Sequence, residues 1–222
     1  MWCTTKLSSQ PLFDIMAVKS LVGCYRRFLV ETAWLLTAFD GGLAGLAAPH
    51  PLGQLHRLCG EMAVVRLHDA WGRFCRELIV SSAGCRPFTA SGVRLARPSA
   101  IQGRSDVIPF LLSTYKNRVY EPRWAVSHDC LDAAQRIGIA NLATVMAAIG
   151  STNSPAEDLR RVRNFFAHRG KWSADEVRFK CTFYAGSQLT LEGLIGQLVA
   201  PGITRMESWV DDLRTVAGAA IQ

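Results

Sequence analysis

Apolar residues recur with the spacing of an α-helix along most of this chain, and that periodicity restricts its fold more than any other feature. Side chains three or four positions apart form one apolar face of a helix. Such faces occur in five segments, which span residues 8–42, 54–84, 127–150, 154–170 and 203–221. Almost everything periodic has this period, so the sequence predicts an all-α helical bundle.

Local signals mark where the two longest helices begin and end. The first opens with a serine cap and has Pro11 in its first turn, and it stops at residues 41–42, which are both glycine. Gly60 and Gly72 weaken the second helix, over 54–84, without necessarily breaking it.

The helix over 154–170 has both ends marked. Ser154 and Glu157 form a capping box around Pro155, which suits the first helical position. Gly170 stands where a C-terminal glycine is expected. This helix is therefore the element that the sequence defines best.

Three shorter elements have weaker signals. Residues 105–118 predict a short helix capped by Ser105. The segment 127–150 can break near Gly138, after which Asn141 can start a new helix. Residues 173–186 fit a short helix and an extended segment equally well.

Residues 84–104 are rich in glycine, proline and serine, and they predict a long inserted loop or a short hairpin. Loops of this length are often functional. No repeat, low-complexity tract or linker divides the chain, so residues 1–222 are predicted to form one domain. The loop carries Arg86, Arg94, Arg97 and Arg104.

Composition restricts the class of protein. Apolar residues make up 49% of the 222 residues and charged residues 19%, which excludes a disordered chain. The formal net charge of +7 favours a polyanionic partner such as RNA, DNA or an acidic protein.

The seven cysteines are widely spaced and include no CxxC pair, so we expect reduced thiols and a cytoplasmic protein. His56 lies near Cys59, and His128 near Cys130, but neither pair has a second pair at zinc-finger spacing. No signal peptide or membrane-spanning segment is indicated. We therefore expect no metal, no cofactor and no membrane contact.

The stretch LRRVRNFFAHRG, residues 159–170, concentrates the chemistry of the chain. On a helix, Asn164 and His168 lie on one face because they are four positions apart. Arg161 lies seven positions before His168 and nearly eclipses it, and the long side chain of Arg163 can swing toward the same patch. Leu159, Val162 and Phe166 form the core stripe of this helix.

Such a patch suits cleavage of an RNA phosphodiester. Histidine transfers protons near neutral pH, and arginine holds phosphate oxygens as negative charge develops. Asparagine can orient the imidazole or hold the phosphate. The alternative is a solvated basic helix face with an unused histidine.

Arg163, Asn164 and His168 in the stretch RNFFAHR resemble the signature of the HEPN superfamily, the higher eukaryotes and prokaryotes nucleotide-binding domains. That signature is an arginine, four to six residues and a histidine, often with a polar residue after the arginine. Arg163 has the four-residue spacing and is followed by Asn164, which is why we prefer it. Arg161 has the six-residue spacing and remains its rival.

The resemblance implies a helical bundle that acts as a metal-independent endoribonuclease, in which Arg163, Asn164 and His168 promote attack by the RNA 2′-hydroxyl. It also implies a homodimer with one composite cleft, a role as a toxin or anti-phage defence effector, and an antitoxin or associated defence protein as partner. Other family members lack activity. The alternative function is a non-catalytic helical module that binds RNA or nucleotides, as a sensor or a toxin-neutralising partner.

Residues outside the motif complete the predicted site. In the stretch 66–78, spacings of three and four suit an ion-paired, solvated face; alternatively this helix packs on the motif helix and lends Asp69 or His68 to the cleft. Trp71 and Phe74 are expected in the core rather than as platforms for stacked bases.

The residues around the end of the motif helix also have two interpretations. Arg161, Arg169 and Lys171 are expected to contact the RNA backbone, and Trp172 to stack on a base; the alternative is solvated charge beside a core tryptophan. Phe165 lies off the core stripe, so it packs on another helix or at a dimer interface.

Overall fold

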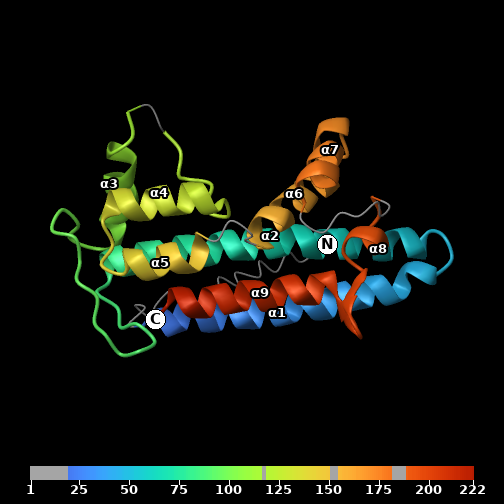
Figure 1. Ribbon diagram of the computed structural model, residues 1–222, viewed down its shortest axis with the longest axis horizontal. Helices are drawn as coiled ribbons and strands as arrows, with labels where there is room; N and C mark the ends of the chain where they lie inside the picture. Colours follow the sequence, from blue (N-terminus) through green and yellow to red (C-terminus); the bar gives the residue numbers. More distant parts are fainter. Residues whose placement is uncertain (1–19, 117–118, 151–154, 182–188) are drawn as a thin grey trace, which may run out of the picture.

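Helices dominate the computed structural model, which describes residues 20–116, 119–150, 155–181 and 189–222 (Figure 1). This confirms the predicted all-α class. The helices are α1 (Leu21–Ala44), α2 (Leu52–Gly84), α3 (Val107–Ser113), α4 (Ser127–Ile137), α5 (Leu142–Ile149), α6 (Pro155–His168), α7 (Lys171–Lys180), α8 (Leu191–Leu194) and α9 (Arg205–Ala220). Short 3-10 turns, η2 (Gly45–Ala47) and η3 (Arg104–Asp106), and an antiparallel pair of strands, β1 (Leu198–Ala200) and β2 (Ile203–Thr204), complete the described part.

The long helices α1 and α2 run side by side in opposite directions, and α9 lies along α1 (Figure 1). The shorter helices α3 and α4 pack near one end of α2, while α6 packs across its middle and leads into α7. Because α2 contacts both α1 and α6, it forms the centre of the bundle.

Three aromatic rings pack together where α1 contacts α2. Trp71 is fully buried and stacks on Phe74 with ring centroids 5.5 Å apart. Phe28 of α1 meets both rings, with centroids 5.9 and 5.2 Å away. The core positions expected for Trp71 and Phe74 are therefore confirmed.

The first helix differs from its predicted bounds at both ends. It begins at Leu21 because Ser20 is extended, forms a bridge to Phe88 and caps the helix by accepting a hydrogen bond from the Val22 N–H. The predicted start, at residues 8–11, lies outside the described residues. At the other end the helix continues through residues 41–42 to Ala44.

Those two glycines do not end the helix, and one of them lies at a close crossing of α1 and α2. A Cβ atom on Gly42 would lie 2.9 Å from the backbone nitrogen of Gly60 on α2. The two backbones can approach this closely only without side chains at the crossing. Gly60 and Gly72 both lie inside an unbroken α2, as the sequence predicted.

The prediction that Gly170 is the C-terminal glycine of α6 is also wrong. The helix ends at His168, and Arg169 takes the left-handed conformation, with φ of 49°, while Gly170 has ordinary extended angles. The guanidinium of Arg169 pairs with Glu61 and lies 5.3 Å from the ring centroid of Phe165, and these contacts offset the backbone strain. Pro155 is the first helical residue, as predicted, and Ser154 lies outside the described residues.

The short elements follow the sequence in part. Gly138 is left-handed and separates α4 from α5, as predicted, although the Asn141 side chain makes no capping bond. Ser105 is not the cap of α3, because Asp106 precedes that helix and accepts bonds from the Gln102 and Gly103 N–H groups. The ambiguous segment 173–186 is helical through Lys180, and its residues 182–186 lie outside the described part.

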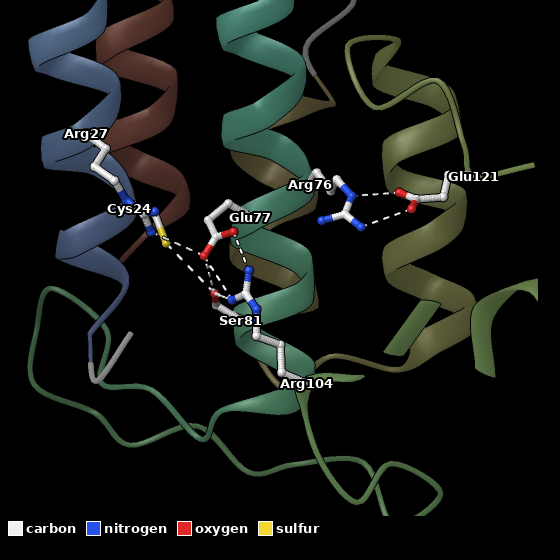
Figure 2. Close-up of polar contacts among 7 residues, drawn as sticks. All are labelled: Cys24, Arg27, Arg76, Glu77, Ser81, Arg104 and Glu121. Atoms are coloured by element: carbon white, nitrogen blue, oxygen red, sulfur yellow. Dashed lines mark hydrogen bonds and ion pairs between the residues drawn. The ribbon is translucent and has the colours of Figure 1, made fainter. Parts of the chain in front are cut away.

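An ion-pair cluster ties the inserted loop to the bundle (Figure 2). Arg104 donates to the carboxylate of Glu77 at 2.9 and 2.5 Å, and Arg27 and Ser81 donate to it at 3.2 Å each. Burial alone would raise the pKa of Glu77, but the bonds and charges of Arg104 and Arg27 outweigh it and hold that pKa below its usual value. Glu77 is therefore an ionised anchor for the end of the loop.

We predict that Glu77→Gln destabilises the protein by about 2 kcal/mol, because it removes charged hydrogen bonds from a mostly buried group. A lowered folded-state pKa stabilises the fold above the usual carboxyl value of 4.5, and this stability disappears as pH falls through the folded pKa. Urea denaturation between pH 3 and 7 should show a flatter profile for the variant. Glu121→Gln, at a more exposed ion pair with Arg76, should cost less; equal losses for both variants would contradict the prediction.

Candidate functional site

A pocket of about 620 Å³ lies between α2, α6 and the segment that precedes α4. Eight of its twelve lining residues are charged or polar. The lining residues are His68, Asp69, Gly72, Arg73 and Arg76 of α2, Arg160, Arg163 and Asn164 of α6, and Arg123, Trp124, Ala125 and Val126 of the intervening segment.

Helix packing brings these three walls together. The apolar face of α6 buries Leu159 and Val162, so Arg160, Arg163 and Asn164 lie on its flank. The third wall approaches α2 at a glycine, where a Cβ atom on Gly72 would lie 3.2 Å from the Cβ of Ala125. The pocket is thus built on packed elements rather than on free loops.

Four of the five arginines that line the pocket form ion pairs with carboxylates. Two of these pairs join different elements, since Arg73 pairs with Glu31 of α1, and Arg76 with Glu121 at 2.6 Å. The other two are more local, and they join Arg123 to Asp129 at 2.9 Å and Arg160 to Glu157 at 3.0 Å.

Arg163 is the exception among these arginines. Within the described ranges its guanidinium forms no ion pair, and it donates one hydrogen bond, to the Asn164 side-chain oxygen at 3.2 Å. Its Nε atom is buried and has no hydrogen-bond partner in the same part of the chain. Within the described residues, Arg163 is therefore the lining arginine without a carboxylate partner, and its guanidinium can pair with an anion that enters the pocket.

His68 lies beside this uncompensated charge. Its side chain is 15% exposed, and both ring nitrogens are buried without a hydrogen-bond partner among the described residues. Burial and, next, the charge of Arg163 lower the pKa of His68 below its usual value, although Asp69, 3.8 Å from Nδ1, acts in the opposite direction. The imidazole is thus neutral at pH 7.

The structure brings four of the predicted site residues into this one pocket: Arg163, Asn164, His68 and Asp69. His168 is exposed at the C-terminal end of α6 and is not among the lining residues. It lies one helical turn beyond Asn164 on the same face, about 6 Å along the axis.

The other predicted substrate contacts lie elsewhere. Arg161 donates to Asp158 at 2.9 Å, and the two side chains are only 19% and 8% exposed. Arg169 pairs with Glu61 on α2, while Lys171 is exposed at the start of α7. Arg161, Arg169 and Lys171 are therefore not among the residues that line the pocket.

The exposures of two aromatic residues near the motif decide between the interpretations left open for them. Phe165 is 6% exposed because other parts of the same chain, including the Arg169 side chain, cover its ring. Trp172 is 67% exposed, so it is not a core tryptophan. Phe179, which lies seven positions later on α7, is 81% exposed.

Sequence reasoning missed Arg123, Trp124 and Arg160 as pocket residues. The positions of the first two depend on a tertiary contact with α2, for which the chain carries no local signal. Of the two interpretations of residues 66–78, packing of this helix on the motif helix is confirmed. Arg73 and Arg76 pair with carboxylates from other segments rather than along their own helix.

The described ranges contain no group of three or more His, Cys, Asp or Glu side chains placed to hold a metal ion. No helix there combines the length and apolar character needed to cross a membrane. Cys24, Cys59, Cys75, Cys85, Cys130 and Cys181 are all free thiols.

Comparisons of the chain with family models, with curated proteins and with solved structures gave no match. Functional inference for this chain therefore depends on the side chains of the pocket and on the motif in α6.

We predict that Arg163→Gln raises the pKa of His68, because it removes the positive charge that disfavours the imidazolium. An NMR titration that follows the ring protons of His68 measures this directly. Arg160→Gln is the matched control and should have a smaller effect, since Glu157 already offsets the charge of Arg160. An unchanged His68 titration in Arg163→Gln would show that the two groups do not interact.

Proposed function

We propose that this protein is a metal-independent endoribonuclease that holds an RNA phosphate on Arg163 and Asn164. The observation that carries the proposal is the uncompensated Arg163 guanidinium in a pocket with a neutral, buried imidazole. Arginine neutralises the negative charge that develops on the phosphate, and histidines transfer the protons, so the reaction needs no metal ion.

The polar side chains of the pocket suit a phosphate in several ways. Asn164 accepts a bond from Arg163 through its oxygen, which leaves its amide N–H groups to donate to a phosphate oxygen. Arg73, Arg76 and Arg123 are held in ion pairs that are at least partly exposed, and such pairs contribute only about 0–1 kcal/mol. Those guanidinium groups can therefore exchange a carboxylate for neighbouring phosphates along the RNA.

His168 has the role of proton donor to the leaving 5′-oxygen in this proposal. Its exposed position one turn beyond Asn164 lets it approach an RNA strand that extends out of the pocket along α6. The products are a 2′,3′-cyclic phosphate and a 5′-hydroxyl, because the 2′-oxygen attacks the phosphorus.

A second candidate function is a non-catalytic RNA- or nucleotide-binding module, which acts as a sensor or a toxin-neutralising partner. The position of His168 outside the pocket favours it, since a binding site needs Arg163 but no proton donor. The resemblance of the motif to the HEPN superfamily favours the nuclease and, with it, a cytoplasmic toxin or anti-phage effector that an antitoxin or associated defence protein restrains.

We predict that the purified protein cleaves RNA in the presence of EDTA and leaves 2′,3′-cyclic phosphate ends. Arg163→Ala should slow single-turnover cleavage about a hundredfold, because it removes a charge-assisted contact to the developing negative charge. His168→Ala should be slow as well, and its expression should be tolerated by cells that wild-type protein harms. A requirement for a divalent ion, or 3′-hydroxyl products, would exclude this mechanism.

Arg161→Ala is the matched control for Arg163→Ala. It removes a bond to the buried Asp158 carboxylate, so it should destabilise the fold by about 2 kcal/mol and leave cleavage per folded molecule near wild type. Circular dichroism measures the folded fraction in each variant. If Arg161→Ala is inactive while folded and Arg163→Ala is active, the six-residue spacing is the working one. If both cleave like wild type, the non-catalytic function becomes the better proposal.

We also propose a homodimer that pairs two copies of the motif, as the resemblance implies. Phe165 is covered within its own chain and does not suit the interface. Trp172 and Phe179 suit it better, because they are exposed on α7, which begins three residues after His168.

We predict that wild-type protein has the mass of a dimer in light scattering at micromolar concentration and that Trp172→Ala with Phe179→Ala gives a monomer. Circular dichroism should show that the variant stays folded, since neither ring contributes to the core, and its melting temperature should fall only by the stabilisation that the dimer supplied. Trp34, which is 69% exposed on α1, supplies the control variant Trp34→Ala. A monomeric wild type that retains nuclease activity would contradict the dimer.

A further inference from the structure

We propose that His68 is the general base of the pocket, the group that takes the proton from the 2′-hydroxyl of an RNA whose phosphate lies on Arg163. This inference rests on the proposed nuclease function and adds a catalytic residue from α2, outside the motif of α6. Four observations support it: the burial of His68, the lack of a hydrogen bond to either ring nitrogen within the described residues, its charged neighbours and its place in the lining of the pocket.

The hydrogen bonding of His68 is unusual for a buried side chain. A neutral imidazole has one nitrogen that donates and one that accepts, and buried polar groups nearly always find partners. Neither ring nitrogen of His68 makes a hydrogen bond within the described residues, although the ring is mostly covered, and Nδ1 has the Asp69 carboxylate 3.8 Å away. Both nitrogens are covered by neighbouring atoms in the free protein, so the proposed base requires the ring or its neighbours in the pocket to shift when RNA binds.

Charged groups from each wall of the pocket line it together with this ring. On α2 they are Asp69, with its carboxylate 3.8 Å from Nδ1, and the arginines Arg73 and Arg76; on α6 they are Arg160 and Arg163. Burial and then Arg163 lower the pKa of His68, Asp69 raises it, and Arg160 lowers it again, with a net fall below 6.5. The third wall adds Arg123.

This balance suits a base rather than an acid. The ring is neutral in the free protein at pH 7, so its unprotonated nitrogen can accept a proton at once. After it accepts the proton, the Asp69 carboxylate and the phosphate charge both stabilise the imidazolium, because a bound anion offsets the charge of Arg163.

The proposed step conserves atoms and electrons. The 2′-hydroxyl proton passes to the unprotonated ring nitrogen of His68, and the electron pair left on the 2′-oxygen forms its bond to phosphorus. The bond from phosphorus to the 5′-oxygen breaks, and that oxygen keeps the electron pair and takes a proton from His168. His68 then returns its proton to water, and His168 regains one.

His68→Gln tests this role, because glutamine retains a polar side chain but cannot accept the proton. Two substrates distinguish base from acid: an RNA oligonucleotide and uridine 3′-(4-nitrophenyl phosphate), whose leaving group needs no proton. We expect His68→Gln to lose about a hundredfold in kcat on both substrates. His168→Gln should lose activity on RNA and recover on the nitrophenyl ester, while His128→Gln, at an exposed histidine, should match wild type.

The pH dependence of kcat/KM supplies a readout that a structural role would not change. For wild type on the nitrophenyl ester, kcat/KM should fall below pH 6.5, through the pKa that NMR assigns to His68 in the free protein. His68→Gln should lose this acidic limb, and it should bind an all-deoxy oligonucleotide, which cannot be cleaved, as tightly as wild type. Because the wild-type comparison of kinetic and NMR pKa values needs no variant, it decides the question even if His68→Gln fails to fold.

Each contrary outcome is distinct. Full activity of His68→Gln on both substrates overturns the role of His68 and leaves the proposed nuclease intact. A loss confined to oligonucleotide binding, with kcat unchanged, makes His68 a phosphate contact and overturns the base. No cleavage of either substrate by wild type overturns the nuclease, and the base with it.

Discussion

The packing of α6 across α2 is the contact on which the pocket depends. Phe165 and Phe166 are almost fully covered, and Arg169 reaches from the end of α6 to Glu61 on α2. Helix α2 is itself fixed against α1 by Trp71, whose ring meets that of Phe28 of α1 edge-on. Since apolar burial holds each helix in place, the polar side chains on their flanks need not contribute stability, and they keep positions that free loops could not give them.

Charge balance determines which of these side chains can bind an anion. Five unpaired guanidinium groups in one pocket would repel one another. Carboxylates from four different segments reduce this repulsion by pairing with four of them. Two of those pairs also join separate elements, because Arg73 reaches α1 and Arg76 reaches the segment before α4. The pairing leaves Arg163 as the one lining arginine with no carboxylate in the described part of the chain. In the proposed function, this arrangement directs the RNA phosphate to Arg163.

Periodicity was sufficient to predict the long helices, because each amphipathic face is a local property of the sequence. It also placed Asn164 and His168 on one face of α6, whereas a contribution of His68 or Asp69 to the cleft was only one of two interpretations of residues 66–78, and the structure puts both in the pocket with Arg163. The errors arose where a distant contact overrode a local signal. Gly42, which was predicted to end the first helix, lies at the crossing with Gly60 instead. Arg169 takes the left-handed conformation beside Glu61, a contact with a distant segment that the sequence does not reveal.

The same distinction applies to the histidines. A motif defines its residues by spacing along one helix, and in α6 that selects His168, which lies in solvent. The pKa of an imidazole depends instead on its burial and on the charges around it. These properties single out His68 of α2, whose pKa is lowered by burial and by the charge of Arg163. Two proton-transfer groups in one reaction work best when their environments differ, because the acceptor must be neutral at the pH at which the donor is charged. In the proposed mechanism His68, buried beside Arg163, is the neutral acceptor. The exposed His168 is the donor, and it can take a new proton from water after each turnover. The proposed division of labour between His68 and His168 follows from these two environments rather than from the motif.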